Sequence, residues 1–322
     1  MKRNLIAALA ALTAGAAMAQ SSVTMYGIAD AGIGKAKIEG DSRVRMISGS
    51  TMNNVTSRIG VRGIEDLGGG WEAGFTFESG FSLNDGAVNS EFWNRQATVS
   101  LGGPWGTLTL GRLWTPADYA YDMWDLTGLA NYSVVENMFW DVGSDFNDRS
   151  EIRYSSPEFG GLTVELAYVP KDNHQDMSGA ADGRTKWDLA LLYENGPIAA
   201  SFDVNKLKGN KANYALGGRY DFGRFAVAAS FTDARAMDLT DDAIAPGYYA
   251  RRGVTLGGRV NLGNVDLTLD LGRDLKKAFG VRKYTNGVAE AKYNLSKRTL
   301  VYAAYLRMDG TNNYGVGLRH SF

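Results

Sequence analysis

Residues 313–322 read NYGVGLRHSF and end the chain on a phenylalanine. Apolar and polar residues alternate along this stretch, as in a β-strand whose two faces meet different surroundings. One face carries Tyr314, Val316, Leu318, His320 and Phe322, and the other carries Gly315, Gly317, Arg319 and Ser321. The pattern predicts a strand with lipid on one side and water on the other, which is typical of a transmembrane β-barrel.

The segment 1–19 has the composition of an export signal. Two basic residues precede an apolar run over residues 5–17, which ends near the small residues that a signal peptidase accepts, Ala17 and Ala19. A membrane-spanning helix needs about 20 apolar residues, so this run is too short for an N-terminal anchor. We predict a signal peptide over residues 1–19 and a mature chain, residues 20–322, that forms one barrel domain.

The composition excludes several classes of protein. Removal of the two basic residues in the signal changes the formal net charge from −1 to −3, which favours no nucleic-acid partner. The chain has no Cys and two His, so disulfides, thiol chemistry and metal sites are not expected, and no cofactor is predicted. No later stretch approaches about 18 continuous apolar residues, which excludes a bundle of membrane helices. Forty Gly and six Pro suit many tight turns between hydrogen-bonded strands.

Sixteen segments along the chain have strand character. They cover residues 23–34, 54–66, 70–83, 91–102, 105–113, 148–155, 161–169, 185–194, 197–206, 211–221, 224–233, 251–262, 264–275, 282–293, 298–308 and 313–322. Short turns and longer loops are expected to alternate strictly between them. An even number of strands places both termini and every short turn on the periplasmic side, and every long loop outside.

The two faces of most strands can be assigned from their alternation. In the segment 264–275, Leu267 and Leu269 are expected to face lipid, whereas Thr268 and Asp270 face water. A large soluble β-sandwich would alternate as well. Sixteen such segments without a second half-buried core pattern favour an all-β, sixteen-stranded antiparallel transmembrane barrel.

Two arginines break this alternation. Arg95 shares its face with Val99 and Leu101, and Arg112 shares its face with Leu110. A β-bulge would explain both exceptions. Cover by a neighbouring subunit would explain them too, and it would place the early strands in an oligomer interface.

The longest connection, residues 114–147, is expected to be functional because unstructured excursions of this length are uncommon in compact folds. It contains six acidic residues and no Lys or Arg: Asp118, Asp122, Asp125, Glu136, Asp141 and Asp145. Its aromatic residues include Trp114, Tyr119, Tyr121, Trp124, Tyr132, Phe139 and Trp140. A sixteen-stranded barrel has a lumen wide enough to receive this segment. We predict that it folds inward and narrows the channel.

Arginines in the flanking strands are expected to form the opposite wall. They are Arg58, Arg62, Arg95, Arg112 and Arg153. Guanidinium groups stay charged, so arginines facing carboxylates would create a strong transverse field across a narrow aqueous gap. Such a field favours polar solutes over apolar ones. Taken one at a time, each arginine could equally be a solvated lumen charge.

An enzymatic function is not expected. Neither His174 nor His320 has an evident Ser or Asp partner for a catalytic triad. His320 and its neighbour Ser321 point to opposite faces of the last predicted strand.

Five segments of the chain resemble the Gram-negative general porins, specifically the trimeric branch typical of β-proteobacteria. They are SSVTMYGIADAGI at 21–33, SRIGVRGIEDLGGG at 57–70, WNRQATVSLGGPWGTLTLGR at 93–112, IRYSSPEFGGLTVELAY at 152–168 and YGVGLRHSF at 314–322. The resemblance implies a homotrimer of barrels whose third extracellular loop forms a constriction. It implies constriction arginines at Arg58, Arg95, Arg112 and Arg153, and facing acids among Asp118, Asp122, Asp125 and Glu136. Phe322 resembles the signature read by the barrel assembly machinery.

The sequence therefore predicts an outer-membrane porin for passive diffusion of ions and small hydrophilic solutes. A solute-specific channel, with Trp114, Trp124 and Trp140 as a stacking track, is one alternative. A structural or adhesin barrel plugged by its loop is another. Expected partners are two further copies of the chain, outer-membrane lipids and lipopolysaccharide, the solutes, and the assembly machinery. The arginines favour anions, whereas the loop acids favour cations, and we lean to anions because the arginines are held on strands.

Overall fold

The structure is a computed structural model that describes residues 22–88, 91–139, 147–171, 183–235, 250–278 and 281–322. The predicted signal peptide, residues 1–19, lies outside the described residues, as do Trp140 and His174. No helix in the described part of the chain is both long enough and apolar enough to cross a membrane.

Antiparallel strands make up almost all of the described regular structure. The wall is formed by β1 (Ser22–Lys35), β3 (Arg58–Gly68), β4 (Trp71–Gly80), β5 (Gln96–Gly103), β6 (Gly106–Trp114), β7 (Asn147–Ser155), β8 (Leu162–Val169), β9 (Lys186–Asn195), β10 (Ile198–Leu207), β11 (Asn213–Asp221), β12 (Phe225–Ala234), β13 (Arg251–Asn261), β14 (Val265–Asp274), β15 (Thr285–Asn294), β16 (Thr299–Met308) and β17 (Thr311–Ser321). A short strand, β2 (Arg45–Ile47), and a 3-10 turn, η2 (Lys37–Glu39), lie in the first connection, and α2 (Pro116–Asp122) and α3 (Val134–Phe139) lie in the third.

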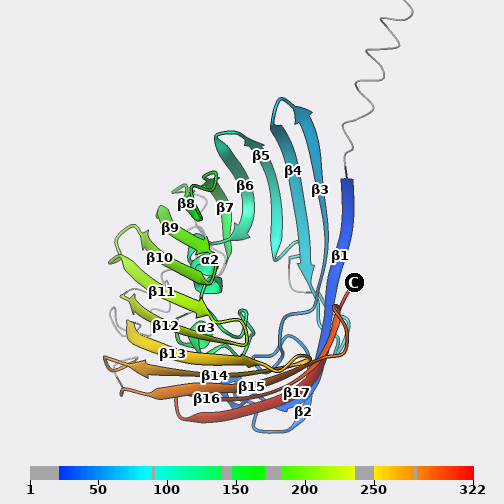
Figure 1. The fold of residues 1–322 in the computed structure, drawn as a ribbon, viewed down its shortest axis with the longest axis vertical. Helices are drawn as coiled ribbons and strands as arrows, with labels where there is room; N and C mark the ends of the chain where they lie inside the picture. Colours follow the sequence, from blue (N-terminus) through cyan, green and yellow to red (C-terminus); the bar gives the residue numbers. More distant parts are fainter. Residues whose placement is uncertain (1–21, 89–90, 140–146, 172–182, 236–249, 279–280) are drawn as a thin grey trace, which may run out of the picture.

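The wall closes on itself because β1 pairs with strands from both ends of the chain. Its first half, residues 22–28, pairs with β3, and its second half, residues 28–35, pairs with β17. The terminal residue completes the seam, since Phe322 N donates to Gly27 O at 3.0 Å and Gly27 N donates to Phe322 O at 3.1 Å. The predicted closed, sixteen-stranded antiparallel barrel is confirmed (Figure 1). Closure satisfies the strand edges that would otherwise be left unpaired in a membrane.

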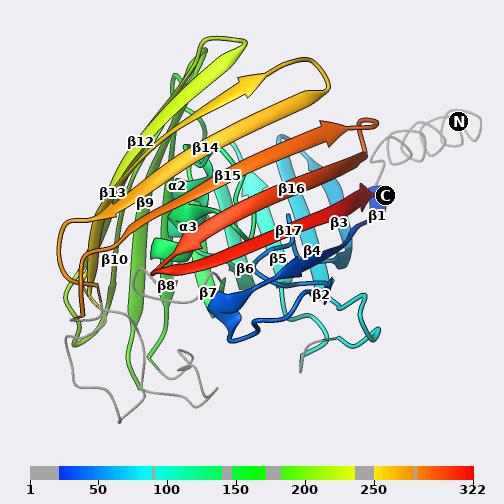
Figure 2. The same cartoon turned by 90° about the horizontal axis from the view of Figure 1, so that it is seen from below.

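β1 begins and β17 ends at one end of the barrel, which we call the terminal end (Figure 2). The opposite end, the loop end, carries the connections after β1, β4, β6 and the other strands that run away from the terminal end. The alternation of faces is confirmed along the strands. In β14, Leu267 and Leu269 are 43% and 55% exposed on the outside, whereas Thr268 and Asp270 are 4% and 2% exposed.

The expected strict alternation of short turns and long loops is wrong at the last hairpin. At the loop end, β16 and β17 are joined by two residues, Asp309 and Gly310. Both have positive φ, 48° and 83°, which is the backbone of a tight two-residue hairpin turn. At the terminal end, by contrast, the turn over residues 156–161 is longer than this loop. An Asp-Gly pair between two strands was the local signal for the short connection.

The structure explains both arginines that broke the alternation. Arg95 precedes β5, which begins at Gln96 and not at residue 91, where the predicted segment 91–102 begins, so strand parity does not apply to it. Arg112 lies at a register shift between Gly111 and Leu113 in the pairing of β6 with β7, where a β-bulge turns its side chain. The bulge interpretation therefore holds for Arg112. Neither arginine requires a covering subunit, and the interface inferred from them loses its basis.

Candidate functional site

The third connection folds into the barrel. It leaves β6 at Trp114, and both of its helices, α2 and α3, lie inside the ring of strands in Figure 1. The entry into α2 follows from local sequence. Thr115 is the N-cap residue, its hydroxyl accepts from Asp118 N at 3.3 Å, and Pro116 occupies the first turn. We call the described part of this segment, residues 115–139, the lumen loop.

Trp124 anchors the lumen loop to the wall. Its side chain is 1% exposed, and its Nε1 donates to Ser201 Oγ on β10 at 2.8 Å. Ser201 Oγ in turn donates to the carbonyl of Ala120 in α2 at 2.6 Å. The indole ring lies over Gly217 of β11, where any Cβ would collide with it. The absence of a side chain at Gly217 therefore leaves the space that the Trp124 ring occupies.

A second contact with the barrel wall holds α3. Met138 and Val134 lie against Gly272 of β14, where an added Cβ would collide with the Met138 sulfur. Phe139 and Met138 also lie over Gly253 of β13. Small wall residues thus face large loop residues across several strands. The main buried apolar cluster of the molecule is the contact between lumen loop and wall.

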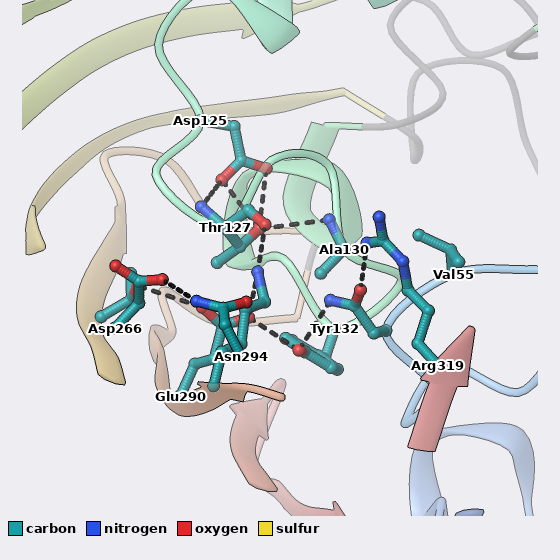
Figure 3. Close-up of polar contacts among 12 residues, drawn as sticks. Val55, Asp125, Thr127, Ala130, Tyr132, Asp266, Glu290, Asn294 and Arg319 are labelled. Carbon is teal, nitrogen blue, oxygen red and sulfur yellow. Dashed lines mark hydrogen bonds and ion pairs between the residues drawn. The ribbon is translucent and has the colours of Figure 1, made fainter. Parts of the chain in front are cut away.

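A chain of hydrogen bonds crosses from the wall through the lumen loop to the first connection (Figure 3). Tyr132 donates to Glu290 on β15 at 2.7 Å and accepts from Asn54 at 2.9 Å. The other atom of the Asn54 amide accepts from Arg319 of β17 at 2.7 Å. Lys292 bonds Glu290 at 2.9 Å and the carbonyl of Thr127 at 2.8 Å. The loop is therefore held by polar contacts as well as by apolar packing.

Glu78 organises the arginines on the other side of the lumen. It lies on β4 and is 5% exposed. Its carboxylate accepts from Arg95 Nε at 2.6 Å and from the hydroxyl of Tyr26 at 3.0 Å, and Arg58 Nε lies 3.6 Å away. Arg95 also stacks on Trp114, with its guanidinium carbon 4.7 Å from the ring centroid. One buried carboxylate thus fixes two of the predicted constriction arginines.

Two further arginines extend this group. Arg62 is exposed on the same face of β3 as Arg58, and its guanidinium lies over the Tyr26 ring at 5.3 Å. Arg319 and Arg95 lie within Coulombic range of Arg58. The tethers to Asn54 and Glu78 hold these like charges in place against their mutual repulsion. We call Arg58, Arg62, Arg95 and Arg319 the arginine group.

Arg153 and Arg112 lie elsewhere. Arg153 is 3% exposed, covered by Tyr119 of α2 at 5.0 Å and bonded to Glu151 at 2.8 Å. It holds the loop to the wall and presents little charge to water, in contrast to the prediction from its strand face. Arg112 bonds Glu91 of the second connection at 2.7 Å.

The four predicted acids divide into two groups. Asp122 is exposed on α2, while Asp118 and Glu136 are half-buried. Asp125 is 1% exposed, and its carboxylate accepts from the backbone N and hydroxyl of Thr127 at 2.8 and 2.9 Å. It stabilises a turn inside the lumen loop and does not line water. No three His, Cys, Asp or Glu residues of the described chain are grouped so that they could hold a metal ion.

The protonation of two loop acids is shifted by their surroundings. Burial, with a smaller contribution from Asp122, raises the pKa of the Asp118 carboxyl to about 7, against the opposing effects of Arg95 and Arg153. Burial and repulsion from Asp118 and Asp125 raise the pKa of Glu136 well above its usual range. Below pH 7 the loop side of the lumen therefore loses negative charge.

We expect ion preference to change with pH in the direction that this shift dictates. As the pH rises through about 7, Asp118 ionises, and the zero-current potential under a salt gradient should move toward cations. A titration of that potential from acidic to alkaline pH checks the expectation. Asp118→Asn should flatten the step near neutrality. A wild-type titration without such a step would exclude Asp118 from the permeation path.

Glu78 and Arg319 are site residues that the sequence analysis did not identify. For Arg319 the signal was present, since it falls on the water-facing side of the last predicted strand. For Glu78 the signal lay in the pairing of β3 with β4. Gly60 is paired with Glu78, so Glu78 lies on the same face of the sheet as Arg58 and Arg62. Because Gly60 has no side chain, the Tyr26 ring has room beside the Glu78 carboxylate.

Comparison with known proteins agrees with this arrangement. A family model described as Gram-negative porin matches residues 6–313. Outer membrane porin protein 32 of Delftia acidovorans is 32% identical over 98% of this chain and 92% of its own length. An outer membrane porin protein of Bordetella pertussis is 30% identical over 100% of both chains. Among solved structures, the anion-selective porin from Comamonas acidovorans aligns with a TM-score of 0.76 and 26% identity over 94% of this chain and 100% of its own.

A closed sixteen-stranded barrel with a loop folded into its lumen defines a channel of the outer membrane. The chain belongs to the Gram-negative porin family, as the resemblance of its five segments implied. It is located in the outer membrane and forms a porin channel.

Proposed function

We propose that this porin conducts ions and small hydrophilic solutes passively, prefers anions and catalyses no reaction. The observation that carries the proposal is the separation of charge in the lumen. The arginine group is tethered to the wall by Glu78 and Asn54, and the carboxyl groups of Asp118, Asp122 and Glu136 lie on the lumen loop. A field directed from one side to the other orders water and disfavours apolar solutes.

The preference for anions follows from the unequal protonation of the two sides. Guanidinium groups stay charged at every physiological pH. Asp118 is partly neutral near pH 7 because its pKa is raised to about 7, the pKa of Glu136 is raised in the same direction, and Asp125 is buried. The positive side therefore keeps more of its charge. The similar structure from Comamonas acidovorans, which is described as an anion-selective porin, supports the same direction.

Replacement of Arg58 by Ala tests this assignment. Removal of one guanidinium from the arginine group should lower the ratio of anion to cation permeability by about threefold, since a unit charge at a few ångströms in water contributes on the order of 0.5–1 kcal/mol. The zero-current potential in a planar bilayer under a salt gradient should move toward cations.

Two variants act as controls for this experiment. Arg58→Lys keeps the charge and should keep most of the selectivity. Arg298→Ala removes the same charge from an exposed turn at the terminal end and should leave the potential unchanged. An unchanged potential in Arg58→Ala would remove Arg58 from the filter.

The solute-specific alternative receives less support. Trp124 is buried against Gly217, and the Arg95 guanidinium stacks on the Trp114 ring. Neither indole is therefore available as an open surface on which a solute could stack. Saturation of the single-channel current by a candidate solute would favour the alternative. Absence of conductance by the folded protein would favour a structural or adhesin barrel.

The assembly of the channel is part of the proposal. We propose that residues 1–19 are removed on export, that Phe322 is read by the barrel assembly machinery, and that three copies form the native porin. The similarity to the trimeric porins supports the trimer. Chemical cross-linking of the protein in native outer membranes tests it, with a trimer as the expected limit product and a monomer as the contrary result.

A further inference from the structure

A groove lies on the outside of the barrel at the loop end of β14, β15 and β16, which run side by side in Figure 2. Its volume is about 620 Å³. The lining includes the apolar residues Leu269, Leu271, Ala289 and Tyr305 and the basic residues Arg282, Lys283 and Arg307. None of the lining residues, all in the described part of the chain, carries a carboxylate.

Strand pairing arranges this lining in rows. Leu269, Ala289 and Tyr305 are paired across three strands in one row, and Leu271, Gly287 and Arg307 form the next row toward the loop end. The small residues Ala289 and Gly287 form the floor between taller neighbours. The second row thus adds one basic residue, Arg307, to an otherwise apolar surface, in the direction in which a membrane changes from acyl chains to headgroups.

The basic residues are held beside the groove. The guanidinium of Arg282 lies over the Tyr284 ring, 4.6 Å from the ring centroid. Its Nη2 lies close to Gly310, since a Cβ added at Gly310 would be 2.7 Å from this nitrogen. Arg273, in the row beyond, donates to Thr285 at 2.6 Å. Arg282 therefore reaches the groove from the connection between β14 and β15, whereas Arg273 lies just outside its lining.

The nearby acids are directed away from the groove. Asp274 and Asp309 both bind Arg251 on the lumen side, at 2.9 and 2.7 Å. Asp274 is 1% exposed. The positive charge at the mouth of the groove is therefore not neutralised by its own loop, and it favours an anionic ligand.

We infer that this groove binds a membrane lipid whose headgroup carries phosphate. An acyl chain would lie along Leu269, Ala289 and Tyr305, where it buries apolar surface. The phosphate oxygens would bind Arg282, Lys283 and Arg307, since guanidinium and ammonium groups are the usual partners of phosphate in proteins. A second copy of the chain is a poorer occupant. It would have to desolvate several like charges, and charged residues are depleted at the centres of protein interfaces.

Lipid retention by the folded protein tests the inference. Native mass spectrometry in neutral detergent can count bound phosphatidic acid with two palmitoyl chains. We expect Arg282→Gln/Lys283→Gln/Arg307→Gln to weaken retention by at least about tenfold, because each basic residue near a lipid headgroup contributes on the order of 1 kcal/mol. The matched control, Arg224→Gln/Lys297→Gln/Arg298→Gln, removes three exposed charges at the terminal end and should retain lipid like the wild type.

A second variant separates a lipid from free phosphate. Ala289→Phe fills the apolar floor without changing charge, so it should weaken phosphatidic acid but leave competition by inorganic phosphate unchanged. Equal retention in the triple variant and its control would overturn the inference, and so would unchanged lipid binding in Ala289→Phe. Dissociation of the oligomer by the triple variant, with unchanged lipid binding per chain, would assign the surface to a second copy instead. Bilayer conductance reports whether each variant is folded, independently of lipid binding.

Discussion

Replacing Gly217 by Leu is expected to release the lumen loop and raise single-channel conductance. A side chain at this position occupies the space of the Trp124 ring, so the ring must leave its seat. Its departure breaks the bond to Ser201 and exposes a large aromatic surface that is 1% exposed in the native protein. Loss of a buried Trp contact costs about 3–5 kcal/mol, enough to shift a docked loop almost wholly to the undocked state.

The adjacent glycine supplies the control for this variant. Gly218 lies on the opposite face of β11, and an added Cβ there would meet Ala199 O at 3.5 Å and the Ala200 Cβ at 3.6 Å, which is ordinary contact. Gly218→Leu should therefore conduct like the wild type. Permeation of larger sugars into proteoliposomes provides a second measurement. Equal conductance and equal sugar permeation in the two variants would show that Trp124 does not hold the constriction.

The sequence predicted the wall better than the lumen. A strand that has lipid outside and water inside must alternate, and the positions of Leu267, Leu269, Thr268 and Asp270 follow from that requirement alone. The start of β5 was placed too early, at residue 91, whereas the strand begins at Gln96. The error at Arg95 arose in this way.

The sequence could not specify which lumen residues the loop covers. Arg153 has the parity of a water-facing residue, yet Tyr119 covers it. Asp125 belongs to the acidic loop, yet Thr127 holds it inside a turn. Parity assigns a side chain to a face of the wall, whereas its access to water depends on a contact between segments distant in sequence. The wall glycines that lie opposite large loop residues indicate where the loop contacts the wall. They can be recognised as contact sites only once the register of the strands is known.

The second large effect is expected from Glu78→Gln. Gln has nearly the same shape as Glu, but it removes the one buried negative charge that Arg95 and Arg58 share. Breaking a buried ion pair from one side commonly costs about 3–5 kcal/mol, so the two guanidinium groups should move apart and toward water. The lumen also gains a net positive charge. The zero-current potential should therefore move toward anions, opposite to the shift in Arg58→Ala.

The double variant Arg58→Ala/Glu78→Gln distinguishes charge from position. It restores the net charge of the wild-type lumen, so its potential should return close to the wild-type value if fixed charge alone sets selectivity. Glu72→Gln is the matched control, because Glu72 lies on the same face of β4 nearer the terminal end and is exposed. If the double variant kept the cation shift of Arg58→Ala, the position of Arg58 would matter beyond its charge. The tether from Glu78 would then act by fixing where the guanidinium stands, and not by tuning how much charge the lumen carries.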